Sequence, residues 1–196
     1  MKKKLIIYGA SGHGKVAADI AKLNGYEDII FYDDDQVKNK FGPFQVIHVF
    51  PEEKDYDLFI AIGDNKTREL ISKRFDDIVT LIHPSAVIGE DVTLGNGVIV
   101  MANAVINPGT VIGDGTIINT CSSIDHDNII GKYNHFSVAS HSAGTVITGD
   151  RVFAGIGAVI VNNVSICDDV LIGAGGVVID DIKEKGTYIG VPVKKK

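Results

Sequence analysis

The 196-residue chain contains only two cysteines and no apolar run that approaches the length of a membrane-spanning helix. A helix that crosses a bilayer needs about 20 apolar residues in a row, so the sequence predicts no membrane partner. The two cysteines, Cys121 and Cys167, lack the spacing of a metal or redox motif and are too few for a disulfide scaffold. We therefore expect a reduced, cytoplasmic protein.

Basic residues are also too few for a protein whose main task is to bind nucleic acid. The 19 Lys and Arg residues are outnumbered by 25 Asp and Glu residues, which gives a formal net charge of −6. Proteins that bind nucleic acids neutralise phosphates with a surplus of basic side chains. The sequence therefore predicts no nucleic-acid partner.

Leucine nearly disappears in the second half of the chain. Residues 83–196 contain 34 Val and Ile residues but only two leucines. Leucine favours helices, whereas valine and isoleucine favour strands, so this segment predicts nearly pure β-structure. The dipeptide His83-Pro84 marks the junction, because a residue before proline is pushed out of the helical conformation. We expect two domains, residues 1–82 and residues 83–196.

The first domain alternates between strand and helix patterns. Strands are predicted over residues 4–8, 29–32, 58–62 and 78–82, and helices over residues 15–24 and 67–75. Such alternation is typical of a small Rossmann-like parallel sheet with helices on its faces. Ligands bind these sheets at the carboxyl ends of the strands. Three predicted loops lie there: Gly9–Gly14, Asp33–Asp35 and Gly63–Asn65.

The glycine loop after the first strand resembles two phosphate-binding motifs without matching either. Its glycines are spaced GxxGxG instead of the dinucleotide fingerprint GxGxxG. Gly9–Lys15 fits GxxxxGK, but Val16 replaces the hydroxyl residue that would hold Mg²⁺ in an ATPase. Glycines still permit close approach, and the first amides of a helix attract phosphate, so a nucleotide or nucleotide-sugar is the favoured ligand. Asp33 and Asp34 would bind its ribose or base. A plain tight turn and a solvated acidic loop are the alternatives.

A six-residue repeat runs through the second domain. Every sixth residue from Ile88 to Val178 gives sixteen positions, of which thirteen are large and apolar. A six-residue period is typical of a flat strand followed by a tight corner, and three such units close one triangular coil, which gives about five coils here. Three successive inward positions are smaller, Ser142, Thr148 and Ala154. With the glycines nearby, they predict a groove for a thin ligand.

Three histidines lie close together in the repeat. His126 is predicted at a corner between Asp125 and Asp127, where a carboxylate would orient it as a general base. A solvated turn histidine is an equally good interpretation. His135 is nine residues further on, and the β-face between the two measures about 15 Å at about 3.3 Å per residue. The two therefore would cooperate only across a subunit boundary. We favour no special role for His141.

The motifs together resemble the two-domain sugar acetyltransferases. The resemblance rests on the YGASGHG loop, the strand that ends in Asp-Asp, the AIGDN segment and hexapeptide repeats with a His-acid pair, and it covers essentially the whole chain. It is most specific for the UDP-4-amino-sugar N-acetyltransferases of the bacillosamine pathway. It implies a left-handed parallel β-helix, a homotrimer, and acetyl transfer from acetyl-CoA to the 4-amino group of a UDP-4-amino-4,6-dideoxy sugar without a metal.

The resemblance also implies roles for individual residues. His126 corresponds to the catalytic base, Asp127 to the carboxylate that raises its basicity, and His135 and Gly144 to contacts with acetyl-CoA. The expected nucleotide-sugar contacts are Ser11, Gly12, His13, Asp33, Asp34 and Gly63. Family members often carry Glu at the position of Asp127, and usually Ala at the position of Val193.

Three other functions are compatible with parts of the sequence. A sialic acid O-acetyltransferase would differ only in its acceptor, which is a hydroxyl. A zinc hydratase of the γ-carbonic anhydrase type would use His126, His135 and His141 as ligands. A non-catalytic nucleotide-binding scaffold would bind a nucleotide but not acetyl-CoA.

Overall fold

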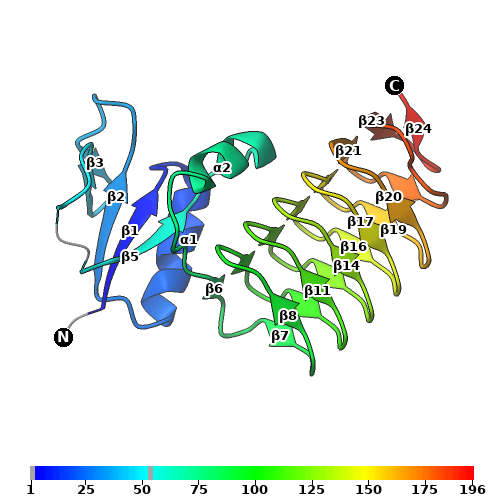
Figure 1. Cartoon of the computed structure of the whole chain (residues 1–196), viewed down its shortest axis with the longest axis horizontal. Helices are drawn as coiled ribbons and strands as arrows, with labels where there is room; N and C mark the ends of the chain where they lie inside the picture. Colours follow the sequence, from blue (N-terminus) through cyan, green and yellow to red (C-terminus); the bar gives the residue numbers. More distant parts are fainter. Residues whose placement is uncertain (1–2, 53–54) are drawn as a thin grey trace.

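The computed structural model describes residues 3–52 and 55–196, which form a small α/β domain and a long rod of stacked β-coils (Figure 1). The sheet of the α/β domain has the strand order β3-β4-β2-β1-β5. Its strands are β1 (Lys4–Tyr8), β2 (Asp28–Tyr32), β3 (Lys40–Phe41), β4 (Phe44–Ile47) and β5 (Asp57–Ile60). All neighbours pair in parallel except β3 and β4, which form an antiparallel hairpin.

The two helices of this domain, α1 (Gly12–Leu23) and α2 (Asn65–Ser72), pack against opposite faces of the sheet. Successive side chains of a strand point to opposite faces, and β1 shows both. Leu5 and Ile7 are buried in the cluster that contains α1, whereas Ile6 and Tyr8 are buried with Ile71 of α2. Because β1 is covered on both faces, its sequence is a continuous apolar run.

The predicted strands and helices of this domain are confirmed with one exception. The segment predicted as a strand over residues 78–82 forms only β6 (Leu81–Ile82), and β6 pairs with the rod strand β9 (Ile99–Val100). The reason is that the segment passes from one sheet to the other: the Val79 amide donates to Leu58 of β5, and the Leu81 amide to Val98 of the rod. A division of the chain at residue 82 stays a prediction, and rod pairing begins at Leu81.

The rod has three parallel sheets, one for each face of a triangular coil. The first rod sheet contains β6, β9, β12 (Ile117–Ile118), β15 (His135–Phe136), β18 (Phe153–Ala154), β21 (Val170–Ile172), β23 (Gly186–Ile189) and the antiparallel β24 (Lys194–Lys195). The second contains β7 (Val87–Ile88), β10 (Val105–Ile106), β13 (Ser123–Ile124), β16 (His141–Ser142), β19 (Val159–Ile160) and β22 (Val177–Val178). The third contains β8 (Thr93–Leu94), β11 (Val111–Ile112), β14 (Ile129–Ile130), β17 (Ile147–Thr148) and β20 (Ser165–Ile166).

One coil takes eighteen residues, as the pairing of Val105 with Ser123 shows. The predicted inward residues stack into one continuous apolar core along the rod. The small inward residue Ala154 lies beside the large Phe136 of the neighbouring coil, so the column keeps its volume there. The α/β domain followed by a parallel β-solenoid of hexapeptide repeats is therefore confirmed, and its left-handed winding stays a prediction.

The α/β domain packs against the first rod sheet. Ile99, Met101 and Ile117 of the rod belong to the same buried cluster as the apolar face of α1. Within residues 3–52 and 55–196, neither helix has the length and apolar character that a bilayer crossing requires.

Candidate active site

His126 lies at the corner between the second and third rod sheets. Its Nδ1 atom is 2.8 Å from Oδ2 of Asp127, and both side chains are more than half exposed. Asp127 has φ of 57°, the left-handed conformation that closes this corner and that aspartate tolerates better than most residues. The hydrogen bond that Nδ1 donates to Asp127, with the nearby Asp125 carboxylate, holds the pKa of His126 above its ordinary value of 6.5. Nε2 is the ring nitrogen that remains to accept a proton.

A glycine makes room for each member of this pair. A Cβ atom on Gly144, one coil after His126, would lie 2.6 Å from Cε1 and Nε2 of the imidazole. A Cβ atom on Gly109, one coil before Asp127, would lie 2.6 Å from its Oδ1 atom. The structure thus places Gly144 against His126. Both residues were expected in one site, and they lie side by side. Gly109 was not predicted, although its offset of one coil from Asp127 is visible in the sequence.

His135 lies in β15 on the first rod sheet, buried beneath the α/β domain. Its Nε2 atom is 3.0 Å from Nδ2 of Asn119, and its Nδ1 atom is 3.4 Å from the carbonyl oxygen of Gly63. Its ring centre is 6.5 Å from that of His13. The fold therefore brings together three of the predicted site residues: His13, Gly63 and His135.

Both histidines of this group are neutral at ordinary pH. Burial, with the positive charge of Arg68 and the neighbouring His13, lowers the pKa of His135 to about 3. Burial and Arg68 lower the pKa of His13 to about 4. The buried Nε2 atom of His13 has no hydrogen-bond partner among the residues that the structure describes.

His126 and His135 lie on different parts of the triangular coil. The first is at the corner between the second and third sheets, and the second is on the first sheet against the α/β domain. Across residues 3–52 and 55–196, no hydrogen bond, ion pair or ring contact joins them. That the two cooperate across a subunit boundary stays a prediction.

The glycine loop leads directly into α1. Ser11 is the extended residue before the helix, and its side chain makes no capping hydrogen bond. Ser11 and Gly12 are exposed, and the first amides of a helix have no partner within it. These residues are therefore free to contact an anionic ligand, in the place predicted for a nucleotide phosphate.

The two aspartates after β2 already have partners inside the chain. The Asp33 carboxylate accepts hydrogen bonds from the amides of Ala10 and Asp35, at 2.9 and 3.0 Å. Partial burial raises the pKa of Asp33, but these hydrogen bonds and Lys38 lower it more strongly, so the group is charged. Asp34 accepts from the hydroxyl of Tyr8 at 2.5 Å. The aspartates therefore hold the glycine loop and the sheet together, a role that the sequence did not indicate.

A cleft of about 570 Å³ separates the start of α2 from the first rod sheet. Its lining includes Gly63, Lys66, His135, Phe153 and Leu171. His135, Phe153 and Leu171 occupy equivalent positions in β15, β18 and β21, so they form a ladder along one wall. The cleft contains two of the predicted site residues and is the cavity in which His135 can meet a ligand.

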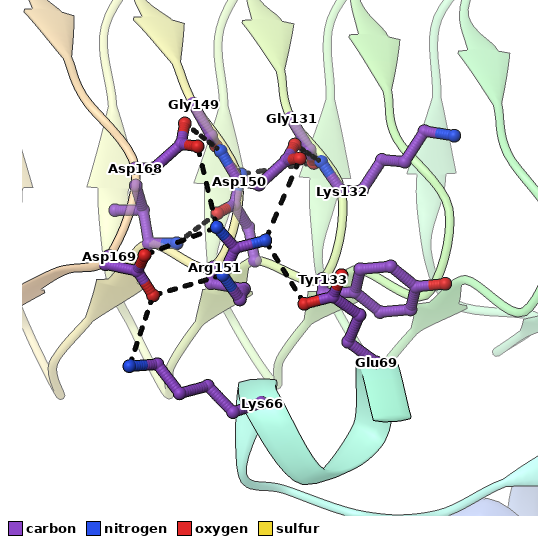
Figure 2. Close-up of polar contacts among 12 residues, drawn as sticks. Lys66, Glu69, Gly131, Lys132, Tyr133, Gly149, Asp150, Arg151, Asp168 and Asp169 are labelled. Carbon is purple, nitrogen blue, oxygen red and sulfur yellow. Dashed lines mark hydrogen bonds and ion pairs between the residues drawn. The ribbon is translucent and has the colours of Figure 1, made fainter. Parts of the chain in front are cut away.

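A group of ion pairs closes the side of this cleft (Figure 2). Arg151 of the rod donates to Asp169 at 3.0 Å and to Glu69 of α2 at 3.1 Å, and Lys66 of α2 lies 3.4 Å from Asp169. The Arg151 side chain is only 17% exposed, so its pairs with Glu69 and Asp169 are better shielded from water than ordinary surface pairs. They fix the first turn of α2 on the rod.

Arg68 completes the attachment of α2. It is 1% exposed, and its guanidinium donates to the side-chain oxygen of Asn65 and to main-chain carbonyl oxygens. The carbonyl acceptors belong to the α/β loop and to three positions of the rod: Ile62, Gly63, Gly115, Tyr133 and Asn134. All its hydrogen-bond acceptors are neutral, and burial lowers its pKa to about 9. Arg68 thus fixes the Gly63 loop relative to the strand of His135.

The zinc-hydratase alternative would use His126, His135 and His141, and these three form no metal-binding group within residues 3–52 and 55–196. His141 lies on the second rod sheet, where its Nδ1 atom is 2.8 Å from the hydroxyl of Ser123. Within the described ranges 3–52 and 55–196, no three His, Cys, Asp or Glu side chains are placed to hold one metal ion. The zinc-hydratase alternative therefore has no set of ligands in a single copy of the chain.

Two sequence families match this chain, each in the expected domain. The PglD N-terminal domain matches residues 4–75, and the bacterial transferase hexapeptide repeats match residues 91–126. A curated relative, UDP-N-acetylbacillosamine N-acetyltransferase of Bacillus subtilis (strain 168), is 31% identical over 112 residues. That match spans 51% of this chain and 52% of the relative, so the chain spans about half the length of that curated protein.

Solved structures match over the whole chain. The acetyltransferase domain of PglB from Neisseria gonorrhoeae FA1090 is 33% identical with a TM-score of 0.92, and the match covers 100% of both chains. The chain belongs to this family of two-domain hexapeptide-repeat acetyltransferases. Another structure of that domain holds acetyl coenzyme A. PerB from Caulobacter crescentus, solved with CoA and GDP-perosamine, is 37% identical with a TM-score of 0.89, over 98% of this chain and 97% of its own.

In this acetyltransferase, several residues that the sequence did not predict also shape the candidate site. Gly109 makes room for Asp127, Asn119 binds His135, and Arg68 joins the Gly63 loop to the rod. Arg68 gave no sequence signal, because a charged residue in a short helix is usually exposed. Asn119 lies sixteen residues before His135, an offset that fits neither the six-residue repeat nor the eighteen-residue coil.

Proposed function

We propose that the protein transfers the acetyl group of acetyl-CoA to the 4-amino group of a nucleotide-linked 4-amino-4,6-dideoxy sugar, with UDP as the favoured nucleotide. The observation that carries this proposal is the exposed His126–Asp127 pair, joined at 2.8 Å and flanked by glycines. Two relatives support the class of substrate, since one is named for a UDP-sugar and one was solved with GDP-perosamine. We also propose a cytoplasmic location, supported by the two free cysteines.

The two histidines have opposite electrostatic environments, which supports different roles. His126 is exposed and its pKa is raised, so its neutral form is a good proton acceptor near neutral pH. His135 has a pKa of about 3 and is too weak a base to take a proton from an amine. Groups whose environments push their pKa values apart commonly divide the tasks of a reaction. We therefore assign the base to His126.

The reaction needs only one proton acceptor on the protein. The neutral 4-amine of the sugar attacks the thioester carbonyl, and a C–N bond forms while the C–S bond breaks. Nε2 of His126 takes the proton that the amine loses, and Asp127 stabilises the resulting imidazolium through Nδ1. The proton then passes to the departing thiolate, which leaves as free coenzyme A.

His135 is assigned to the acetyl-CoA side of the site. Nδ2 of Asn119 donates to Nε2 of His135, which leaves the proton on Nδ1 and directs it toward Gly63. At 3.4 Å the Gly63 carbonyl holds this N–H only weakly, so the thioester oxygen would replace it as acceptor and have its negative charge stabilised there. Ser11, Gly12, His13, Asp33, Asp34 and Gly63 are proposed to bind the nucleotide-sugar, and Gly144 to contact acetyl-CoA through its backbone.

A homotrimer would bring His126 of one copy to the cleft of the next. The outward residues of the third rod sheet support such packing, because Val111, Ile129 and Ile147 stack in one line and are 42%, 53% and 48% exposed. A row of exposed apolar side chains is typical of an interface. This row borders the corner that carries His126.

Release of free thiol from acetyl-CoA tests the proposal. The acceptors are a UDP-4-amino sugar, a GDP-4-amino sugar and sialic acid, and the variants are His126→Ala and the matched control His141→Ala. We expect release with a nucleotide amino-sugar, a loss of at least about 100-fold in His126→Ala, and little change in the control. Acetyl-CoA affinity, measured by calorimetry, should be similar in all three proteins.

Each other outcome overturns a stated part of the proposal. Release with sialic acid alone identifies an O-acetyltransferase. Normal turnover in His126→Ala removes this residue from the role of base. Nucleotide binding without acetyl-CoA binding identifies a non-catalytic scaffold.

A further inference from the structure

Asn128 is completely buried inside the coil beneath the His126 corner. Its Nδ2 atom is 2.7 Å from the carbonyl oxygen of Asp125, 3.2 Å from that of His126 and 3.0 Å from that of Ala143. Asp125 and His126 belong to the turn that carries the proposed base. Ala143 precedes Gly144 in the next coil. One side chain therefore ties the two turns that contact each other through the His126 ring.

Ser142 fixes the orientation of this amide. Its hydroxyl donates to Oδ1 of Asn128 at 2.8 Å, so the oxygen faces Ser142 and the nitrogen faces the three carbonyls. Ser142 occupies an inward position of the repeat, where most coils have a large apolar residue. A buried hydroxyl is costly unless it is hydrogen bonded, and here Asn128 provides the partner. The interruption of the apolar column at Ser142 thus serves the His126 turn.

The coil does not need an asparagine at this position in order to close. One coil further along, Val146 fills the equivalent site and is completely buried. One coil earlier the residue is Thr110, whose hydroxyl donates to one carbonyl only, that of Asp125 in the next coil at 2.9 Å, and accepts from the Asn128 amide at 3.3 Å. Asn128 makes the corresponding bond to Ala143 and adds the two bonds to its own turn. These two extra bonds flank His126.

We propose that Asn128, oriented by Ser142, is a positioning residue that holds the His126 turn at a fixed distance from Gly144. The proposal rests on the proposed role of His126 as the base. Because Asn128 binds main-chain atoms on both sides of the imidazole, it restricts the backbone from which the ring projects. Misplacement of a catalytic group by about 1 Å can lower a rate 100-fold, so a buried tether at this point affects turnover.

The variant Asn128→Thr tests the proposal with little disturbance of packing. Threonine occupies the equivalent site one coil earlier, so it should keep the bond to Ala143 and lose the two bonds beside His126. The control is Asn134→Thr at the next corner, where Nδ2 of Asn134 bonds to the carbonyls of Gly131 and Gly149 at 3.1 and 3.0 Å. Nδ2 of Asn134 also donates to the Thr148 hydroxyl, and its Oδ1 accepts from the Val152 amide. Asn134→Thr should therefore lose at least as much thermal stability as Asn128→Thr.

We expect the kinetic effects of these variants to differ. Asn128→Thr should lower kcat roughly 10- to 100-fold, with little change in the KM for acetyl-CoA or for the sugar. Asn134→Thr should lower kcat much less. A looser turn weakens the hydrogen bond between His126 and Asp127, so the acid limb of the kcat profile should move to lower pH. Ser142→Ala should show the same changes in weaker form. Ser142→Thr, which keeps the hydroxyl, should retain the wild-type pH profile of kcat.

The experiment separates this proposal from the proposed function. If His126→Ala is inactive while Asn128→Thr keeps the wild-type kcat and acid limb, the positioning role is wrong and the proposed base stands. If Asn128→Thr and Asn134→Thr lose turnover equally with an unchanged acid limb, Asn128 has a structural role only. If His126→Ala is active, the proposed function fails first. Should Asn128→Thr fail to fold, the Ser142 pair gives the same decision.

Discussion

The imidazole of His126 occupies the space that a side chain on Gly144 would need. The two residues are one coil apart, and an ideal Cβ on Gly144 would be 2.6 Å from two atoms of the ring. Gly144 does not have the positive φ that favours glycine at some other corners of the rod, such as Gly109. Its lack of a side chain therefore serves the histidine and not the backbone.

Gly144→Ala should lower turnover by displacing the His126 ring while leaving the fold intact. The alanine backbone is unstrained here, so the melting temperature should change little, and kcat should fall roughly 10- to 100-fold. A double-mutant cycle with His126→Ala provides the check, because two residues that act through one contact are not additive. Adding Gly144→Ala to His126→Ala should cause no further loss. Equal losses in both backgrounds would show that Gly144 acts elsewhere.

Asp127→Asn should move the acid limb of the activity profile to lower pH. The base must be neutral, so activity rises as pH increases through the pKa of His126, which Asp127 holds above 6.5. Loss of the carboxylate lowers that pKa, and the weaker base should also lower the maximal rate about 10-fold or more. The measurement is kcat between pH 5.5 and pH 9, which we choose to bracket the shift. Asp127→Glu, which keeps a carboxylate, is the control and should retain the wild-type limb. An unchanged limb in Asp127→Asn would contradict this account of the pair.

Arg68→Lys should destabilise the protein by about 3 kcal/mol or more, since several buried carbonyls lose their donor. Lysine cannot reproduce the planar set of donors that spans Asn65, the Gly63 loop and the rod. Urea unfolding measures the change. The control is Arg74→Lys, where the guanidinium of an exposed residue donates to the Tyr8 hydroxyl at 3.0 Å, and it should cost less than about 1 kcal/mol. Similar losses in both variants would show that Arg68 is not the main attachment of α2.

The stability of the protein should fall as pH decreases below 6.5. His135 has a folded-state pKa of about 3, so the unfolded chain binds a proton more readily between pH 6.5 and pH 3. Stability is then fully present above 6.5 and is lost at lower pH, by about 2 kcal/mol from this group at pH 5. His13 acts in the same direction.

Urea unfolding of wild type and His135→Gln at pH 8 and pH 5 checks this dependence. The glutamine variant should lose about 2 kcal/mol less than wild type over that interval. An equal loss in the two proteins would show that His135 is not the source of the pH dependence.

The sequence predicted the rod well, because its signal is repeated at every coil. Positions such as Ile124 and Phe136 share one environment, and their six-residue spacing is preserved from Ile88 to Val178. The His126–Asp127 pair was also predictable, since adjacent residues at a corner stay close in space whatever surrounds them.

Contacts between distant parts of the chain were not predictable. The pattern at residues 78–82 is apolar enough for a strand, but only the structure shows that β6 joins the rod. The sequence around Arg68 predicted a helix, but nothing in it indicated that the Arg68 side chain binds the carbonyls of Tyr133 and Asn134. The aspartates after β2 were predicted as ligand contacts from their place at the end of a strand, and the sequence did not show that they also bind groups in other parts of the chain, such as Tyr8.

Ser142 shows most clearly why a departure from a pattern is hard to interpret. The sequence identified it as a weak point of the apolar column and predicted a groove. Its partner is Asn128, fourteen residues earlier, an offset that belongs neither to the repeat nor to the coil. A single sequence shows that such a residue is unusual, but not which side chain lies opposite.

The eighteen-residue coil limits how the rod can change in length. Deletion of six residues after residue 127 would preserve the apolar spacing but rotate every later residue to the next face of the triangle. Gly144 would then no longer lie against the imidazole of His126, and a bulkier residue from another corner would take the place of Gly144. Deletion or duplication of eighteen residues would instead return each side chain to its original face. Gene segments that encode whole coils are therefore the natural units by which such a protein can grow or shrink.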